Sequence, residues 1–458
     1  MTKTSVKLFA LITLVVVLSG CGGGNGTPPD NPPVVTHAWT WVSGSNMASQ
    51  TGIYGTKGTG SPSNVPGARY GAVSWIDSSG KLWLFGGAGY DSGYYSLNDL
   101  WKYDLMTNEW TWVSGSNARN QAGIYGTQGT SDPANVPGAR YGAVSWIDSN
   151  GKFWLFGGNS RNDLWRYDPT TLEWTWISGS DSGDQLGIYG TKGIADSLNV
   201  PGARSGAVSW IDSSGELWLF GGSGRDSASP FASPLNDLWR YDPTTLEWTW
   251  ISGNDSGDQL GIYGTKGIAD SLNVPGARSG AVSWIDSSGK LWLFGGYGPD
   301  PAGSGARGEF NDLWRYDPTT NEWTWVSGSN TLVQQGTYGR KGKADPANVP
   351  GAREQAVSWL DSSGKLWLFG GGYWGTLNDL WTYDPTANEW TWVSGSNSTF
   401  QSGVYGAKGT AGSSNVPGSR HWAISWLDSS GNLWLFGGWG NDSTVYNGPL
   451  NDLWRYTR

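Results

Sequence analysis

The sequence predicts an all-β protein in which six copies of one unit form a ring of small antiparallel sheets. Three observations predict this fold. Short apolar runs alternate with turn residues along the chain, and none of these runs has a helical period. Three sequence landmarks recur six times. The 458 residues also include 72 Gly and 33 Trp, which suits tight turns and large packed side chains.

Each copy of the repeat is marked by an arginine, a glycine pair and the sequence NDLW. The arginine ends the sequence PGAR or PGSR, and the units are numbered one to six by these residues: Arg69, Arg140, Arg204, Arg278, Arg353 and Arg420. The first glycine of an FGG triplet follows each arginine by 17 residues. The connection from FGG to NDLW varies between 3 and 14 residues, so the variable loops are expected at the same place in every unit.

Four strands are expected in each unit, as unit three illustrates. The sequences AVSWI (207–211) and ELWLFGG (216–222) form one pair, joined by DSSG, in which Gly tolerates a positive φ. The sequences NDLWRYD (236–242) and EWTWI (247–251) form a second pair, joined by a turn in which Pro fixes the first φ. A sheet this small cannot bury both of its faces, so the copies must pack on one another. A ring of copies leaves no long free edge.

These units resemble kelch repeats. The resemblance lies in the apolar run that ends in a glycine pair, Gly86-Gly87 in unit one, and in Tyr103 and Trp110, which are separated by six residues. It extends over residues 39–456. The family implies a six-bladed kelch-type β-propeller with four antiparallel strands per blade, the AVSW strand innermost and the WTW strand outermost.

The two ends of the repeated region predict how the ring is closed. The region begins with the sequence WTW (39–41), a fourth strand without its first three. It ends with NDLWRY (451–456), a third strand without its fourth. We therefore expect the N-terminal outer strand to join the three C-terminal strands and to complete the sixth blade.

The N-terminus predicts a secreted protein with a lipid anchor. Two lysines precede an apolar run (8–18) that is too short to span a bilayer but suits a secretory leader. The sequence LSGC that follows resembles the lipobox of bacterial lipoproteins, which implies cleavage before Cys21 and a lipid on its thiol. The alternative is an ordinary signal peptide with an incidental cysteine.

The leader divides the chain into three expected regions. Residues 1–20 are a lipoprotein signal peptide, residues 21–36 are a flexible tether rich in Gly and Pro, and residues 37–458 are the propeller. The expected location is the cell envelope, with the protein anchored by its lipid at the periplasmic or outer surface of a bacterial membrane. The lipid is the only expected contact with a membrane.

Composition argues against several classes of function. The net charge is −9 and no run of Lys or Arg occurs, so a nucleic-acid partner is not expected. Some kelch-family proteins are copper radical oxidases that use a Tyr–Cys crosslink and histidine ligands. This chain has two histidines and one cysteine, Cys21, so neither that chemistry nor a zinc site is expected. We expect no metal and no other cofactor, and we assign no catalytic residue.

Most of the conspicuous residues are explained by the repeat itself. Thirty of the 33 Trp recur at fixed places and are interpreted as packing residues. The six repeated arginines have two interpretations. They either ring the channel entrance and hold an anion, or each pairs with the Asp of an NDLW sequence. The one-to-one count favours the second interpretation.

Residues that break the repeat are the candidates for a binding site. After the inner-strand arginine, units one to four carry Tyr-Gly or Ser-Gly, whereas units five and six carry Glu354-Gln355 and His421-Trp422. Because the variable connections and the starts of the inner strands open on one face of the blade, these exceptions are expected to converge over units five and six. The candidate ligand-binding residues are Glu354, Gln355, Tyr373, Trp374, Arg420, His421, Trp422 and Trp439. The alternative is that Trp422 only fills space in the closing blade.

These features predict a lipid-anchored binding scaffold that recognises an extracytoplasmic protein or polysaccharide through the variable-loop face. The alternative function is a carbohydrate-active enzyme with its site at blades five and six, in which Glu354 and His421 form an acid–base pair. A third hypothesis is a passive surface spacer. The fold alone does not decide among them, because propellers host all three roles.

Overall fold

The computed structural model describes residues 37–90, 94–372 and 375–458. The predicted signal peptide (1–20), the predicted tether (21–36) and the candidates Tyr373 and Trp374 lie outside the described residues. These described residues form one compact unit. The described residues contain strands and turns and no α-helix. Accordingly, they include no helical segment with the length and hydropathy needed to cross a membrane.

The described strands form six large sheets, one for each unit. From the inner strand to the outer strand, unit one forms β3 (Val73–Ile76), β4 (Leu82–Phe85), β7 (Leu100–Asp104), β8 (Glu109–Ser114) and β2 (Gly60–Ser61). Unit two forms β10 (Val144–Ile147), β11 (Phe153–Phe156), β12 (Leu164–Asp168), β13 (Glu173–Ser178) and β9 (Ser131–Asp132). Unit three forms β16 (Val208–Ile211), β17 (Leu217–Gly224), β18 (Ser233–Asp242), β19 (Glu247–Ser252) and β14 (Ala195–Asp196), with β15 (Arg204–Ser205) beside β17.

The remaining units have the same order. Unit four forms β21 (Val282–Ile285), β22 (Leu291–Phe294), β25 (Leu313–Asp317), β26 (Glu322–Ser327) and β20 (Ala269–Asp270). Unit five forms β28 (Val357–Leu360), β29 (Leu366–Phe369), β30 (Leu380–Asp384), β31 (Glu389–Ser394) and β27 (Ala344–Asp345). The sheet of unit six contains β34 (Ile424–Leu427), β35 (Leu433–Phe436), β38 (Leu453–Thr457), β1 (Ala38–Ser43) and β32 (Ala411–Gly412).

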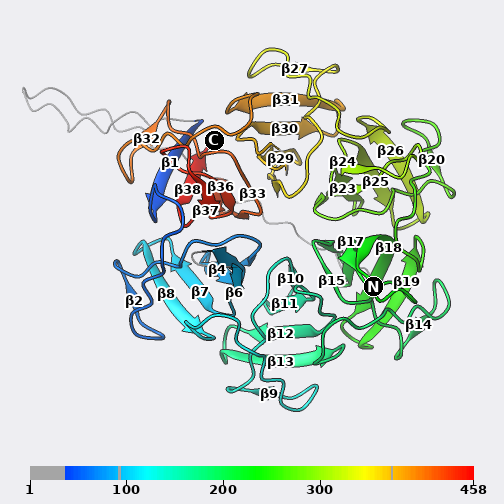
Figure 1. Ribbon diagram of the computed structural model, residues 1–458, viewed down its shortest axis with the longest axis horizontal. Helices are drawn as coiled ribbons and strands as arrows, with labels where there is room; N and C mark the ends of the chain where they lie inside the picture. The colour runs from blue at the N-terminus through cyan, green and yellow to red at the C-terminus, as the bar shows by residue number, and fades with distance from the viewer. Residues whose placement is uncertain (1–36, 91–93, 373–374) are drawn as a thin grey trace, which may run out of the picture. The chain divides into compact units, whose positions relative to one another are not determined.

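The sheets are antiparallel and lie around a common centre, which is the arrangement of a β-propeller (Figure 1). The four expected strands of each unit pair in the expected order, and a fifth strand of two residues adds to the outer edge. This short strand comes from the connection that precedes each PGAR sequence. Each inner strand also lies beside the inner strands of two neighbouring sheets, so β3 contacts both β10 and β34.

The N-terminal strand β1 lies in the same sheet as the C-terminal strands. It pairs with β38 in antiparallel register, with Trp39 opposite Tyr456 and Trp41 opposite Trp454. In unit three, β19 pairs with β18 in the corresponding way, with Trp248 opposite Tyr241 and Trp250 opposite Trp239. The chain ends thus supply strands to one sheet in the order that the repeat uses elsewhere.

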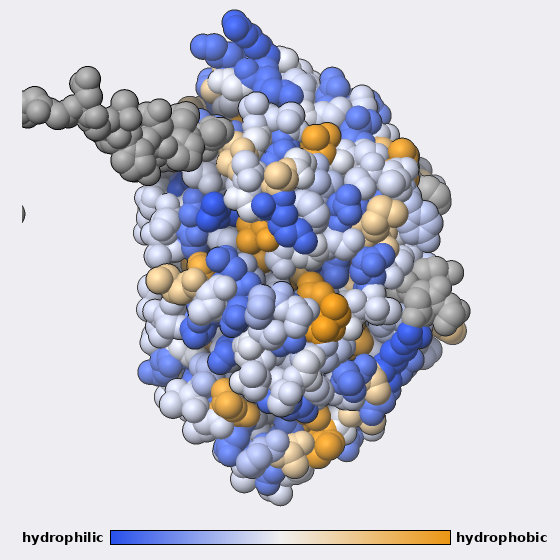
Figure 2. Space-filling model, turned by 90° about the vertical axis from the view of Figure 1, so that its left-hand side faces the viewer, coloured by the Kyte–Doolittle hydropathy of each residue, from blue (hydrophilic) through white to orange (hydrophobic). Residues whose placement is uncertain are grey.

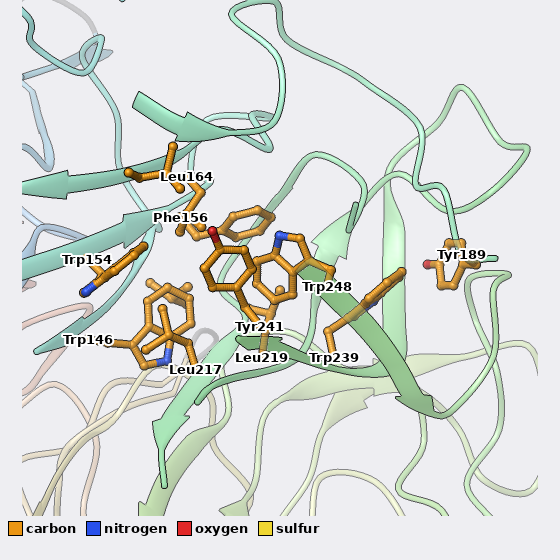
Figure 3. Packing of buried hydrophobic residues seen from close by; sticks show 12 residues of the cluster. Trp146, Trp154, Phe156, Leu164, Tyr189, Leu217, Leu219, Trp239, Tyr241 and Trp248 are labelled. Carbon is orange, nitrogen blue, oxygen red and sulfur yellow. The ribbon is translucent and has the colours of Figure 1, made fainter. Parts of the chain in front are cut away.

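The surface and the interior differ strongly in polarity. The face shown in Figure 2 is mostly polar, and its apolar residues form small separate groups. Buried aromatic and aliphatic residues instead fill the spaces between neighbouring sheets. Between units two and three, Trp154 and Phe156 pack against Tyr241 and Trp248 (Figure 3). Similar clusters lie between other neighbouring sheets. This confirms the interpretation of the repeated tryptophans as packing residues, because large aromatics bury about 150–250 Å² each.

The repeated arginines lie inside the sheets. Arg204 is 1% exposed, and its two terminal nitrogens donate to the two oxygens of Asp237, each at 2.7 Å. Arg204 also donates to backbone carbonyls, and the Tyr189 hydroxyl donates to Asp237 at 2.7 Å. Equivalent pairs occur in the other units. The pairing with the Asp of NDLW is therefore confirmed, and the arginines do not form an anion-binding ring.

Candidate ligand-binding groove

A closed cycle of backbone hydrogen bonds links the starts of the six inner strands. In each unit, the second residue after the repeated arginine donates its N–H to the carbonyl of the corresponding residue in the preceding unit, at 2.6–2.9 Å. The cycle runs through Gly71, Gly142, Gly206, Gly280, Gln355 and Trp422. The bond from Gly71 to Trp422 joins unit one to unit six at 2.8 Å.

All six residues of this cycle have a left-handed backbone, which explains why four of them are glycine. Their φ angles lie between 55° and 68°. Residues with a Cβ atom adopt this region at an energetic cost, whereas glycine does not. Gln355 (φ 57°) and Trp422 (φ 55°) are the two exceptions. Gln355 and Trp422 therefore have a strained backbone, which the other four units avoid by having glycine at this position.

The side chain of Trp422 lies over this cycle. A Cβ atom built on Gly71 or on Gly142 would lie 3.1 Å from the indole, and one on Gly206 would lie 3.6 Å from it. The indole thus reaches from unit six across units one and two. Trp422 is only half-buried. It therefore packs against the propeller and also contributes to the surface.

Trp422 borders a groove formed by two adjoining cavities of about 290 and 430 Å³. Both cavities include Tyr70 and Tyr94 in their walls. The other residues of the smaller cavity are Thr376, Phe400, His421, Trp422, Trp439 and Asn447. The other residues of the larger cavity are Ala88, Tyr95, Ser96, Asn120, Tyr141 and Asn159. We call these residues together the aromatic groove.

Two hairpins in the variable connections position the exposed rings of the groove. In unit one the hairpin consists of β5 (Ala88–Tyr90) and β6 (Tyr94–Ser96). In unit six, β36 (Trp439–Asn441) pairs with both β37 (Asn447–Pro449) and β33 (Arg420–His421). The β5 and β37 strands are in contact, so the two hairpins lie side by side. The groove therefore forms where unit six meets unit one.

The aromatic rings are held by contacts with one another. The rings of Tyr70 and Trp439 are nearly perpendicular, with centroids 5.5 Å apart. The rings of Tyr94 and Trp439 are closer to parallel, at 28°, with centroids 6.2 Å apart. Tyr141 meets Trp422 edge to face at 6.3 Å. The indole N–H of Trp439 donates to Asn447 Oδ1, which fixes the orientation of the ring.

His421 contributes a neutral imidazole to the groove. Its Nδ1 lies 2.9 Å from the carbonyl oxygen of Gly372, so Nδ1 carries the proton in this contact. Burial lowers the pKa of His421 to about 4, although the Gly372 carbonyl acts in the opposite direction. The ring is therefore uncharged at neutral pH.

The structure separates the predicted site residues into two groups. His421, Trp422 and Trp439 converge as expected, but with aromatic residues of unit one and not with unit-five inner-strand residues. Glu354 and Gln355 do not line the groove. Arg420 is 1% exposed and donates to both oxygens of Asp452, so it is a structural residue and not a ligand contact as expected.

Glu354 and Gln355 lie beside Gly280 of unit four. A Cβ atom on Gly280 would lie 2.9 Å from Gln355 and 3.0 Å from the Glu354 carboxylate. Gln355 Nε2 donates to Glu354 Oε2 at 3.1 Å. Burial raises the pKa of Glu354 to about 8, and the negative charge of Glu309 acts in the same direction. This pair of acids is buried, with exposed fractions of 6% and 5%.

Several groove residues could not be predicted from departures from the repeat. Tyr70 occupies an ordinary repeat position, so its role was not visible in the sequence. Tyr94 and Tyr95 stand in the variable connection of unit one, where two adjacent tyrosines were the available signal. Phe400 and Thr376 belong to unit-five segments in which the sequence shows no sign of a binding role. Across the described residues, no group of three or more His, Cys, Asp or Glu is placed to hold a metal ion.

Comparisons with known proteins identify the repeat. Residues 287–327 match the family model described as Kelch motif. The chain is similar to an N-(sulfonatooxy)prop-2-enimidothioate sulfolyase of Thlaspi arvense, with 27% identity over 261 residues, which are 54% of this chain and 59% of the relative. It is also similar to a xyloglucanase of Paenibacillus sp, with 24% identity over 289 residues, which are 62% of this chain and 25% of the relative.

The chain thus spans less than two thirds of the length of either relative. The matched segment 287–327 contains the FGG, NDLW and WTW sequences of unit four. These sequences recur in the other five units and form the same strands there. The chain therefore contains kelch repeats.

Proposed function

We propose that this protein is a lipid-anchored scaffold that binds a polysaccharide or a protein outside the cytoplasm through the aromatic groove. Kelch repeats support an interaction scaffold in general, and the groove supplies a specific surface for it. The single observation that carries the proposal is the convergence of repeat-breaking aromatic residues, Trp422, Trp439 and Tyr94, on one concave site. Concave aromatic sites with a few fixed polar groups are typical of ligand binding.

The proposal includes a closed six-bladed propeller as the support of the groove. The cycle of backbone hydrogen bonds from Gly71 to Trp422 and the pairing of β1 with β38 both support closure in unit six. A closed ring matters for the site because the groove lies across the junction of unit six with unit one. If the ring opened there, Tyr70 and Trp439 would separate and the groove would be lost.

The lipid anchor and the location in the cell envelope belong to the same proposal. They rest on the LSGC sequence and on the apolar run before it. A groove on the variable-loop face of an anchored propeller would meet components of the envelope or the surroundings of the cell.

Binding to isolated cell-envelope fractions tests this proposal. The full chain, solubilised in detergent, is expected to bind envelope polysaccharide or protein, and the double variant Tyr94→Ala/Trp439→Ala is expected to lose that binding. Phe231→Ala is the matched control, because Phe231 is an exposed aromatic (78%) in the variable connection of unit three, outside the groove. Equal binding by the wild type and the double variant would contradict the proposal.

A carbohydrate-active enzyme is the second candidate, and the buried acid Glu354 favours it. A carboxyl group with a pKa of about 8 stays protonated at neutral pH and suits a general acid. The similarity to a xyloglucanase points in the same direction. Release of reducing sugar from xyloglucan by the wild type, lost in Glu354→Gln and retained in Tyr94→Ala, would establish this second function.

A further inference from the structure

We infer that the ligand of the aromatic groove is an uncharged glycan chain. This inference rests on the proposed function and narrows it, since the proposal alone allows a protein or any polysaccharide. Four features of the described groove residues carry it: the charge of the walls, the aromatic faces, the kind of polar groups, and one buried hydroxyl without a partner.

The charge of the groove walls is the first feature. Among the described residues that line its two cavities there is no Asp, Glu, Lys or Arg. His421 is neutral above about pH 5 because burial lowers its pKa. The guanidinium of Arg119 lies 4.3 Å from the ring centre of Tyr95, but Arg119 is exposed and lines neither cavity. An acidic sugar seated in the groove would lose water without gaining a paired cation from its walls, and that is unfavourable.

The aromatic rings offer faces of the right kind for sugar rings. Tyr94 is 70% exposed and Phe400 is 49% exposed. The near-parallel pair of Tyr94 and Trp439 forms a platform, and Trp422 forms the floor next to the glycine cycle. A pyranose ring has one face of C–H bonds and an edge of hydroxyls, so it can rest on an aromatic face while its hydroxyls reach polar groups. The two cavities share Tyr70 and Tyr94 as walls, so they offer neighbouring places for successive sugars of one chain.

Most polar side chains of the groove, apart from the neutral imidazole of His421, carry amides or hydroxyls. Amides both donate and accept hydrogen bonds, as sugar hydroxyls do. Several of them are fixed in place: Asn120 Oδ1 accepts the Ser96 backbone N–H at 2.8 Å, and Asn159 Nδ2 donates to Ser96 Oγ at 3.0 Å. An extended peptide, in contrast, would need a row of backbone groups along its length to pair its own main chain. Side-chain amides around aromatic faces favour a glycan over a peptide.

Thr376 adds an independent observation. It is 3% exposed and lines the smaller cavity, yet among the described residues its Oγ1 has no hydrogen-bond partner. Buried hydroxyls without a partner are rare because each loses the hydrogen bonds it makes in water. A ligand hydroxyl in the smaller cavity would supply the partner. Thr376 is therefore the residue expected to contact a sugar in the smaller cavity.

Affinity electrophoresis with defined polysaccharides tests this inference. The full chain, solubilised in detergent, is run through gels that contain a neutral polysaccharide (xyloglucan, galactomannan or laminarin) or an acidic one (polygalacturonate or alginate). We expect retardation by at least one neutral polysaccharide and none by the acidic ones. The dissociation constant is expected to rise about 10-fold in Tyr94→Ala and in Trp439→Ala, because each removes a large stacking face. Phe231→Ala is expected to leave it unchanged.

Thr376→Val tests the inference without disturbing the fold. The substitution keeps the shape of the side chain and removes only a hydroxyl that has no partner among the described residues, so the melting temperature is expected to stay equal or to rise. The dissociation constant for the neutral polysaccharide is expected to rise about 3- to 10-fold. Unchanged binding by Thr376→Val together with Tyr94→Ala would overturn the inference.

The outcomes separate the inference from the function on which it rests. One outcome is tighter binding to acidic than to neutral polysaccharide, with this binding lost in Trp439→Ala. It would overturn the inference that the ligand is uncharged, but the groove would remain the binding site. Groove-dependent binding of an envelope protein alone would do the same. Binding of envelope material that is unaffected in Tyr94→Ala and in Trp439→Ala would overturn both.

Discussion

The backbone N–H of Gly71 donates to the carbonyl oxygen of Trp422 at 2.8 Å, and this bond joins the first repeat of the chain to the last. The same tryptophan holds a left-handed backbone, covers the glycine cycle with its indole and borders the aromatic groove. Trp422 thus takes part both in the contact between units six and one and in the candidate site. A strained residue at such a place is typical of a functional role, because strain persists where the surroundings impose it.

Trp422→Gly is expected to separate stability from binding. The substitution gives unit six the glycine that units one to four have at this position. Glycine adopts a φ of 55° without strain. Relief of this strain, about 1 kcal/mol or more, offsets part of the packing lost with the half-buried indole. The melting temperature measured by calorimetry is expected to change little, whereas binding to the groove is expected to fall at least 10-fold.

Gln355→Gly is the matched control for this substitution. Gln355 has the same backbone strain in the same cycle, with φ 57°, but its side chain lies outside the groove. Its removal is expected to leave binding unchanged. If both variants lose binding equally, the cycle itself supports the site and the indole of Trp422 does not contact the ligand.

The features that recur in every unit could be predicted from the sequence. The strands, the packed tryptophans and the pairs such as Arg204–Asp237 recur in every unit, so a single consistent interpretation explained all copies. The groove was predicted only in part. His421 and Trp422 were found because they break the repeat, but Tyr70 matches the repeat and gave no signal. Tyr70 lines the groove because the two variable hairpins contact each other. That contact depends on packing between units rather than on local sequence.

Glu354 shows that a departure from the repeat does not by itself identify a residue of the groove. Glu354 breaks the repeat as strongly as His421 does, and both were expected at one site. The structure buries Glu354 beside Gly280 of the preceding unit, because that glycine leaves room for a carboxyl group. A departure from the repeat therefore identified an unusual residue correctly without showing toward which neighbouring unit its side chain points.

Asp237→Asn is expected to destabilise the propeller strongly. The substitution keeps the size of the side chain but leaves the buried guanidinium of Arg204 without its counter-charge. Breaking a buried ion pair on one side lowers the free energy of unfolding by about 3–5 kcal/mol. Urea denaturation measures the loss. Arg307→Gln is the control, because it removes a mostly exposed pair with Asp258 and is expected to change the free energy by less than about 1 kcal/mol.

The buried acid Glu354 predicts a pH dependence of stability. Burial first, and then the charge of Glu309, raise the pKa of Glu354 from 4.5 to about 8 in the folded protein. The folded state therefore holds this proton more tightly than the unfolded state. Its contribution to stability is complete below pH 4.5 and is lost as the pH rises to about 8. The wild type is expected to lose on the order of 4 kcal/mol through this group across that window.

Glu354→Gln is expected to remove this part of the pH dependence. The amide imitates the protonated carboxyl, so the variant should gain stability relative to the wild type as the pH rises from about 5 to about 9. Thermal unfolding at a series of pH values measures the difference. Glu322→Gln on the outer strand β26 is the control, since it leaves the buried pair of acids intact. Parallel curves for the wild type and Glu354→Gln would contradict the assignment.

Binding at the aromatic groove is expected not to depend on pH between about 6 and 9. Burial lowers the pKa of His421 to about 4, and burial together with the neighbouring tyrosines raises the pKa of Tyr70 to about 12. Neither group changes its charge in this interval. Affinity for a neutral polysaccharide should therefore stay constant while the stability changes through Glu354. A fall in affinity between about pH 6 and 8 would indicate that an ionisable group contacts the ligand.

Trp39→Ala tests the closure of the ring by the N-terminal strand. Trp39 is 1% exposed and packs against Phe369, Trp454 and Tyr456, with ring centroids 5.1–6.4 Å apart. Trp248 has the same surroundings in unit three, where its strand is continuous with the rest of its unit: Phe156, Trp239 and Tyr241 lie at 5.0–6.4 Å. If β1 occupies the outer place in the sixth blade, the alanine variants at 39 and 248 should lose similar amounts of stability. Each loss is expected to be about 3–5 kcal/mol, as for other large-to-small changes in a packed interior. A loss below about 1 kcal/mol for Trp39→Ala, with a full loss for Trp248→Ala, would show that β1 does not hold the ring closed in solution.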